Sequence, residues 1–186
     1  MRKLVAGLFM SLDGVVEMRD PWTVPYFTPD LQEIIQTGMD ESDTIVMGRR
    51  TYEDYASYWP GIADDEDPFA AYINNTPKLV ASSTLKSLDW QNCTLVDRDA
   101  VGEIGRLKQR SGRALSVTGS PRLVRSLLAG DLVDELRLLV FPLLLGDGAR
   151  LFDDWSVRAP MTLLSSRTLD AGVVSMIYAP GPSDTP

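Results

Sequence analysis

The sequence predicts an α/β fold built around one central, mostly parallel sheet. Two observations favour this class. Short apolar runs rich in Val, Leu and Phe alternate with amphipathic helical segments over the first two-thirds of the chain, a pattern typical of parallel sheets covered by helices. The chain then closes on two strand-like segments, 161–169 and 173–179, around Asp170-Ala171-Gly172. These segments predict an antiparallel hairpin at one edge of the sheet.

Each expected element has a local signal. The first strand lies in the run that ends at the Asp13-Gly14 turn, and further strands are expected at 44–48, 78–81, 94–96, 114–117 and 135–141. Helices are expected after Thr28-Pro29-Asp30, after a capping box of Thr51 and Asp54, and from Ser120-Pro121 to Ala129. Two more are expected at 69–74 and 100–111, with an acidic loop at 60–68 and a tight turn at 146–148.

Length and composition limit the domain organisation and the function classes. We expect one domain over residues 1–180 and a disordered tail over 181–186. The chain has no histidine and only one cysteine, Cys93, which excludes Ser-His-Asp or Cys-His catalysis and predicts no metal site. A net charge of −8 argues against nucleic-acid and anionic-lipid partners. Without a membrane-length apolar run or a convincing secretory signal, a cytoplasmic location is expected.

Three predicted strand ends share one chemistry. The first is Gly48-Arg49-Arg50-Thr51, the second is Ser82-Ser83, and the third is Thr118-Gly119-Ser120-Pro121 followed by Arg122. Together they supply helix N-termini, hydroxyl donors and guanidinium groups, which can bind a pyrophosphate and one further phosphate. Each also has an ordinary structural interpretation as a helix start, a polar loop or a solvated arginine pair. None matches the P-loop or the G-x-G-x-x-G fingerprint, so their order along the chain carries the prediction.

The segments SLDG, VMGRRTYE, YWP, PKLVASSTL, VTGSPRLVRSLL, LVDELRL and P-x-L-L-G-D-G-x-x-L-F resemble the dihydrofolate-reductase-like family. More closely, they resemble the reductase domain of the riboflavin-pathway deaminase/reductase and its stand-alone relatives, over roughly residues 2–179. The resemblance implies a three-layer fold with helices on both faces of a mixed sheet. It also implies an NADPH-dependent reductase of a small heterocyclic, pyrimidine- or pterin-like substrate, similar to dihydrofolate reductase or 5-amino-6-(5-phosphoribosylamino)uracil reductase.

The resemblance also implies roles for single residues. Gly48, Arg49, Arg50 and Thr51 match the turn that reaches the adenosine 2′-phosphate, and Ser82 and Ser83 flank the same group. Gly119, Ser120 and Pro121 match the turn that wraps the pyrophosphate, with Thr118 and Arg122 beside it. The loop from Ser11 to Val16, which includes Gly14 and Val15, matches the segment that covers the nicotinamide. Two arginines on one phosphate predict a preference for NADPH over NADH.

The substrate side leaves alternatives open. Asp13 is a candidate proton donor, or simply the first residue of an Asp-Gly turn. Asp30 is a candidate substrate-binding acid, or a first-turn helix acid. Trp59 is a candidate pocket wall or part of the core, and Gly146 a candidate rim contact or a tight-turn residue.

A cofactor-binding sensor or interaction module without catalysis is the alternative to a reductase on the same fold. The 135–141 strand and its closing hairpin could offer a face for a homodimer.

Overall fold

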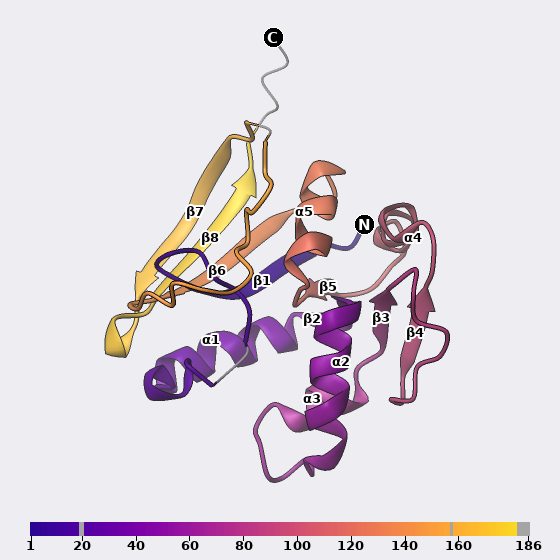
Figure 1. The fold of residues 1–186 in the computed structure, drawn as a ribbon, viewed down its shortest axis with the longest axis horizontal. Helices are drawn as coiled ribbons and strands as arrows, with labels where there is room; N and C mark the ends of the chain where they lie inside the picture. Colours follow the sequence, from indigo (N-terminus) through magenta and orange to yellow (C-terminus); the bar gives the residue numbers. More distant parts are fainter. Residues whose placement is uncertain (19–20, 157, 182–186) are drawn as a thin grey trace.

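The computed structural model describes residues 1–18, 21–156 and 158–181. Within these residues, eight strands form one sheet in the order β4-β3-β2-β5-β1-β6-β8-β7 (Figure 1). Strands β1 to β6 run parallel, whereas β8 is antiparallel to both β6 and β7. The expected parallel sheet with a C-terminal antiparallel hairpin is therefore confirmed. The strands are β1 (Leu4–Ser11), β2 (Ser42–Gly48), β3 (Lys78–Ala81), β4 (Cys93–Val96), β5 (Ala114–Val117), β6 (Glu135–Phe141), β7 (Met161–Thr168) and β8 (Val174–Pro180).

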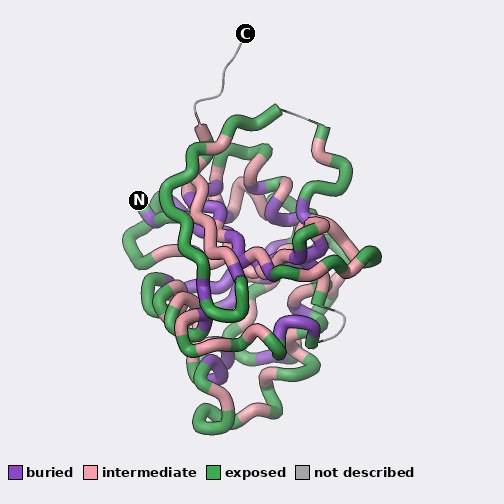
Figure 2. Tube along the Cα trace, turned by 90° about the vertical axis from the view of Figure 1, so that its left-hand side faces the viewer, coloured by how far each residue is buried: buried purple, intermediate pink, exposed green. Residues whose placement is uncertain are grey.

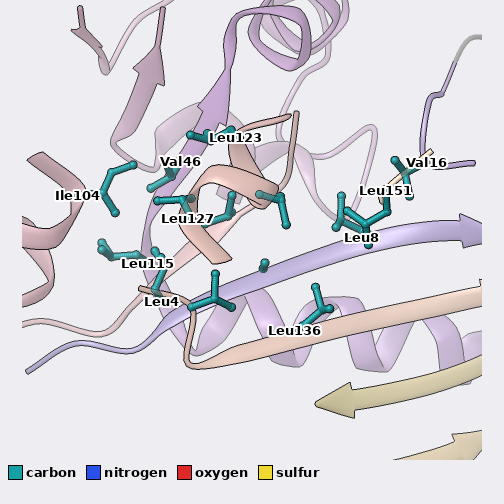
Figure 3. Close-up of a cluster of buried hydrophobic side chains, with 14 of the residues drawn as sticks. Leu4, Leu8, Val16, Val46, Ile104, Leu115, Leu123, Leu127, Leu136 and Leu151 are labelled. Carbon is teal, nitrogen blue, oxygen red and sulfur yellow. The ribbon is translucent and has the colours of Figure 1, made fainter. Parts of the chain in front are cut away.

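Helices cover both faces of this sheet and make three layers. They are α1 (Pro29–Asp40), α2 (Arg49–Tyr58), α3 (Ala70–Asn75), α4 (Ala100–Lys108) and α5 (Pro121–Ala129), with short 3₁₀ turns η1 (Val24–Tyr26), η2 (Trp59–Gly61) and η3 (Asp170–Gly172). Of these, α4 and α5 pack on one face, where Ile104 and Leu127 contact the core around Leu115 (Figure 3). Helices α1, α2 and α3 pack on the other face. None of the helices in the described ranges is long and apolar enough to cross a bilayer.

The two faces follow from the period-2 alternation of strand side chains. In β2, Val46 belongs to the cluster under α4 and α5, whereas Ile45 and Met47 belong to the cluster under α2 and α3. Both clusters are apolar, so β2 is buried along nearly its whole length, as expected for a parallel strand covered on both sides. Strand β7 differs, because it is largely exposed and lies at the edge of the sheet (Figure 2).

Some expected boundaries are wrong. Helix α2 begins at Arg49 with Gly48 as its N-cap residue, so Thr51 lies inside the first turn and forms no capping box. The extended backbone of Gly48 (φ −82°, ψ 169°) lets the chain pass directly from β2 into the helix. The expected helix over 100–111 ends at Lys108. Residues 182–186 of the expected tail lie outside the described residues, and Gly181 donates its N–H to the Pro160 carbonyl at 2.8 Å.

Candidate active site

The candidate residues gather at one edge of the sheet because the parallel strands all end there. Strands β3, β2, β5, β1 and β6 are consecutive neighbours in the sheet. Their carboxyl ends lead in turn into Ser82, Gly48, Thr118, the Asp13 loop and the segment before Gly146. In open α/β sheets, ligands bind outside the carboxyl ends of the strands. The fold therefore brings the three predicted phosphate-binding segments and the first-strand loop to one side of the molecule.

The two principal turns touch each other. The N–H of Gly48 donates to the carbonyl of Gly119 at 2.9 Å. A Cβ atom on Gly48 would lie 2.5 Å from Ser120 Oγ, and one on Gly119 would lie 2.8 Å from Thr51 Oγ1. Gly119 has a φ of +128°, which side chains rarely adopt, and its peptide bond to Ser120 is cis. Gly48 and Gly119 are thus the residues that allow the two turns to pack without a side chain between them.

The helices that leave these turns have N-termini open to an anion. Neither α2 nor α5 has a side-chain cap or an acidic residue in its first turn. The other helices of at least nine residues in the described part of the chain differ, because α1 has Asp30 in its first turn and α4 has both an Asp99 cap and Glu103. An uncapped helix start presents unpaired N–H groups and a partial positive charge. Negative charge is therefore favoured at α2 and α5, where the turns meet.

Three arginines surround this pair of helix starts. Arg49 forms an exposed ion pair with Glu53, with Nη1 2.9 Å from Oε1. Arg50 is also exposed and lies close enough to Asp54 to oppose the rise in the pKa of that carboxyl that burial and Glu53 cause. Arg122 is exposed in the first turn of α5. Bringing a phosphate to Arg49 requires competition with Glu53, which lowers the net gain from that arginine.

The Ser82-Ser83 strand end is next to the first turn but is partly committed to its own loop. Ala81 pairs in register with Gly48, so Ser82 follows at the same edge. Ser82 Oγ accepts hydrogen bonds from the backbone N–H groups of Thr84 at 3.2 Å and Leu85 at 3.1 Å. Ser83 is exposed. Ser82 therefore shapes the loop, Ser83 is the exposed serine of the pair, and ligand contact by either stays a prediction.

Asp13 is built into a clamp between two loops. Its carboxylate accepts hydrogen bonds from the Ser11 hydroxyl at 2.7 Å, the Leu145 N–H at 3.1 Å and the Gly146 N–H at 2.9 Å. These donors, the Ser11 hydroxyl first, hold the pKa of Asp13 well below its ordinary value. Hydrogen bonds of this kind favour the ionised form of the carboxyl, which accepts a proton rather than donating one. These contacts favour the turn interpretation of Asp13, and its assignment as the proton donor stays a prediction.

The clamp also uses the side chains of Ser11 and Arg150, to which the sequence analysis gave no individual role. Ser11 is fully buried, and its Oγ accepts a hydrogen bond from the Val15 N–H at 3.0 Å. Arg150 donates from Nε to the Asp13 carbonyl at 2.9 Å and from Nη2 to the Gly146 carbonyl at 3.1 Å. Gly14, with a φ of +84°, makes the turn. Hydrogen bonds thus connect the loop expected to cover a nicotinamide to the Gly146 loop.

Asp30 also has a structural role. Its carboxylate accepts hydrogen bonds from the Thr28 hydroxyl at 2.6 Å, the Leu31 N–H at 2.9 Å and the Asp170 N–H at 2.9 Å. Thr28 and then Asp170 lower the pKa of Asp30. The carboxylate therefore fastens the start of α1 to the hairpin turn, as a first-turn acid does. The structural role accounts for the three hydrogen bonds of Asp30, and its proposed contact with substrate stays a prediction.

Trp59 lies one helix length from Gly48, at the far end of α2. Its ring packs on Tyr55 and Tyr58 at centroid distances of 6.2 and 5.1 Å. The ten residues of α2 place Trp59 about 15 Å from the phosphate-binding turn at Gly48. Nearer the turns, burial raises the pKa of Tyr55, whose hydroxyl is adjacent to Thr118. The proposed contact of Trp59 with substrate stays a prediction.

Comparison with known proteins defines first the fold class and then the family. A dihydrofolate reductase from Enterococcus faecalis, in complex with NADP(H) and RAB-propyl, has the same fold, with a TM-score of 0.64, 17% identity and 96% of each chain covered. A protein named for riboflavin biosynthesis in Shewanella sp. PV-4 gives a TM-score of 0.78 at 22% identity over 96% of this chain and 99% of that one. The fold is thus dihydrofolate-reductase-like.

The family follows from the sequence comparison. Residues 2–175 match the model of the RibD C-terminal domain, so the chain belongs to that family. The uncharacterized protein YyaP of Bacillus subtilis (strain 168) is 28% identical over 182 residues, which cover 95% of this chain and 94% of YyaP. The expected family resemblance is therefore confirmed.

Proposed function

We propose that this protein is an NADPH-dependent reductase of a small heterocyclic substrate of the pyrimidine or pterin type. The observation that carries the proposal is the contact between two uncapped helix starts, α2 and α5, at the carboxyl edge of the sheet. Family membership and the likeness to a reductase complexed with NADP(H) support the same ligand.

The chain's own residues fit such a cofactor. The close packing of the two turns at Gly48 and Gly119 brings the starts of α2 and α5 together, so that one pyrophosphate could meet the first N–H groups of both helices. Arg49 and Arg50 stand at the start of α2 to bind the 2′-phosphate, with Ser83 on the neighbouring strand end. The clamped loop at Gly14 and Val15 would cover the nicotinamide, which would supply the hydride when bound.

Proton delivery is assigned to water in this proposal. Reduction of a ring C=N or C=C bond needs a proton after hydride transfer, and the chain has no histidine to give one. Of the two candidate carboxyls, Asp13 accepts four hydrogen bonds, one of them from Arg150 Nη2 at 3.4 Å, and Asp30 accepts three. These contacts lower the pKa of both groups. We therefore assign proton delivery to a water molecule admitted beside the clamped loops, since one positioned water can serve as the donor in a site that excludes bulk solvent.

The decisive experiment is a fluorescence titration of NADPH and NADH with the wild type, Arg49→Gln and Arg50→Gln. Loss of one exposed charge-assisted hydrogen bond of about 1.5 kcal/mol should weaken NADPH binding about tenfold and leave NADH nearly unchanged, for at least one of the two variants. Arg158→Gln, an exposed arginine that follows the Gly146 loop by twelve residues, serves as the control. Equal losses for both cofactors would show that the arginines are structural.

Catalysis is tested separately from binding. Oxidation of NADPH is followed at equal enzyme concentration with a panel of pterins and aminopyrimidines. Turnover of one of these supports the reductase. Tight NADPH binding without oxidation by any of them would support the alternative, a cofactor-binding sensor or interaction module, and would refute the proposed activity.

A further inference from the structure

The apolar core on one face of the sheet has a gap. Under α4 and α5, one continuous cluster extends over β2, β5, β1 and β6, and its members include Val46, Leu115 and Leu136 (Figure 3). Under α1, α2 and α3 the core is divided into two clusters, one around Met47 of β2 and one around Phe141 of β6. Among the described residues, β5 and β1, which lie between β2 and β6, supply no buried member to either of these two clusters. The gap therefore lies over the two central strands.

Gly7 and Ser116 form the floor of this gap. In β1, Ala6 and Leu8 belong to the cluster on the opposite face, so Gly7 between them faces α1 and α2. Gly7 is partly exposed, and a Cβ atom added to it would meet nothing within 4 Å, although β1 is in the interior of the sheet. Ser116 of β5 faces the same side by the same alternation. It is also partly exposed, and its hydroxyl group makes no hydrogen bond within the described ranges, so it is free to pair with a ligand.

Helix α1 forms the roof of the gap. Ile35 packs against both clusters, so α1 crosses the gap at this residue. Three residues later, a Cβ atom on Gly38 would meet just Arg137 Nη1, at a distance of 4.0 Å. Arg137 pairs in register with Gly7, which places both glycines beside the same arginine, and we refer to the space between them as the Gly7 opening. The Arg137 guanidinium is already paired with two glutamates, so the Gly7 opening favours an uncharged ligand.

The Gly7 opening leads to the candidate active site. Because Ala6 and Val117 are partners in register, Gly7 lies beside Thr118, where one of the two cofactor turns begins. Tyr55 of α2 packs against the Met47 cluster with its hydroxyl adjacent to Thr118, so it bounds the opening on the α2 side. The floor extends inward by two residues, from Thr118 to Ser116, which is about 7 Å. An aromatic wall and a floor without a side chain favour a flat ring.

We propose that the Gly7 opening binds a substrate with two fused rings, and that Gly7 determines the preference for two rings over one. This inference rests on the proposed reductase function and narrows its substrate to the pterin type. One ring lies beside Thr118, and the second ring passes over Gly7 toward Ser116, whose hydroxyl donates to a ring nitrogen. A side chain at position 7 would occupy the space of the second ring.

The test measures binding by calorimetry on the full chain without NADPH, so no turnover occurs. Three ligands share an amino- and oxo-substituted ring: isocytosine has this ring alone, 2-aminoquinazolin-4-one has a second carbon ring, and pterin has nitrogens in the second ring. Both two-ring ligands should bind at least about tenfold more tightly than isocytosine, because the second ring buries further apolar surface. Ser116→Ala should weaken pterin binding about three- to tenfold and leave 2-aminoquinazolin-4-one within about twofold, since only pterin offers the hydroxyl an acceptor.

Gly7→Val separates binding from stability. Valine suits a strand and meets no neighbour at its Cβ, so the Tm should not fall, whereas binding of both two-ring ligands should weaken at least about tenfold. Binding of isocytosine and of NADPH should stay within about threefold of the wild type. Gly61→Val is the matched control, because a Cβ there also meets nothing within 4 Å but lies in η2, beyond the far end of α2. It should change none of these affinities.

Three results would overturn the proposal: unchanged pterin binding in Gly7→Val, no binding of either two-ring ligand up to about 1 mM, or an equal loss of NADPH binding in Gly7→Val. The last result would mean that the cofactor, not the substrate, occupies the Gly7 opening. Oxidation of NADPH is measured separately, so the reductase function and the substrate preference can each fail alone. Turnover by the wild type with no effect of Gly7→Val on pterin binding would refute only the preference.

Discussion

Replacement of Gly48 by alanine probes the contact between the two cofactor turns. The backbone of Gly48 is extended, at φ −82° and ψ 169°, so alanine adopts it without strain. The added Cβ, however, would lie 2.5 Å from Ser120 Oγ, 3.1 Å from Ser120 N and 3.2 Å from Ser120 Cβ. The hydroxyl can rotate away, but the backbone nitrogen cannot. The Ser120 turn must therefore move by a few tenths of an ångström.

The size of the effect follows from overpacking. Inserting one methyl group into a tight contact costs about 1–3 kcal/mol of unfolding free energy. For a chain of this length, each kcal/mol lowers the Tm by about 2–4 °C, so a drop of about 2–12 °C is expected in a thermal melt. A displacement of this size at the pyrophosphate turn should weaken NADPH binding about five- to tenfold, in line with the steep loss per ångström of misplacement.

A control variant and a double variant test whether the loss comes from the contact between Gly48 and Ser120. Gly7→Ala lies in β1 of the same sheet with no heavy atom within 4 Å of the new Cβ, and its stability should change by less than about 0.5 kcal/mol. Adding Ser120→Gly to Gly48→Ala removes two of the three close contacts and should recover part of the loss, with a coupling above about 0.5 kcal/mol. Equal melts for Gly48→Ala and Gly7→Ala, with no coupling to Ser120, would refute the packing of the turns.

Further predictions concern the carboxylates of Asp13 and Asp30 and the exposed strand β7. Folding lowers the pKa of Asp13 from its ordinary 3.8, so its ionised form stabilises the protein above that pH and the benefit is lost as the pH falls through the folded-state pKa. The Tm deficit of Asp13→Asn should therefore be largest near pH 7 and shrink toward pH 3, whereas a constant gap would contradict the clamp. Asp30→Asn should lower the Tm but leave the KM of any substrate unchanged, and a large rise in KM would restore Asp30 as a substrate ligand. We also propose that two copies pair through β7, where Leu163 and Leu164 are about half exposed. Light scattering should show a dimer that Leu164→Lys converts to a monomer, and a monomeric wild type would exclude it.

The sequence determined the elements and the segments that carry the cofactor chemistry. Short apolar runs are local properties of the sequence. The strands at 78–81, 114–117 and 135–141 could therefore be located to the residue. The start of α5 at Ser120-Pro121 was predicted correctly for the same reason, since proline at the first helical position is a local signal. The start of α2 was not, because the extended Gly48 ends a strand and begins a helix at once.

Tertiary structure supplied the contacts that favour one interpretation of a polar residue over another. Asp13 and Asp30 each had a functional and a structural interpretation, and the partners that favour the structural one, Gly146 and Asp170, lie more than 130 residues away in the sequence. The contact of Gly48 with Gly119 likewise depends on β2 and β5 being neighbours, which the order of strands along the chain does not reveal. A side chain's chemistry is encoded locally, but its pKa and its pairing depend on neighbours that only folding supplies.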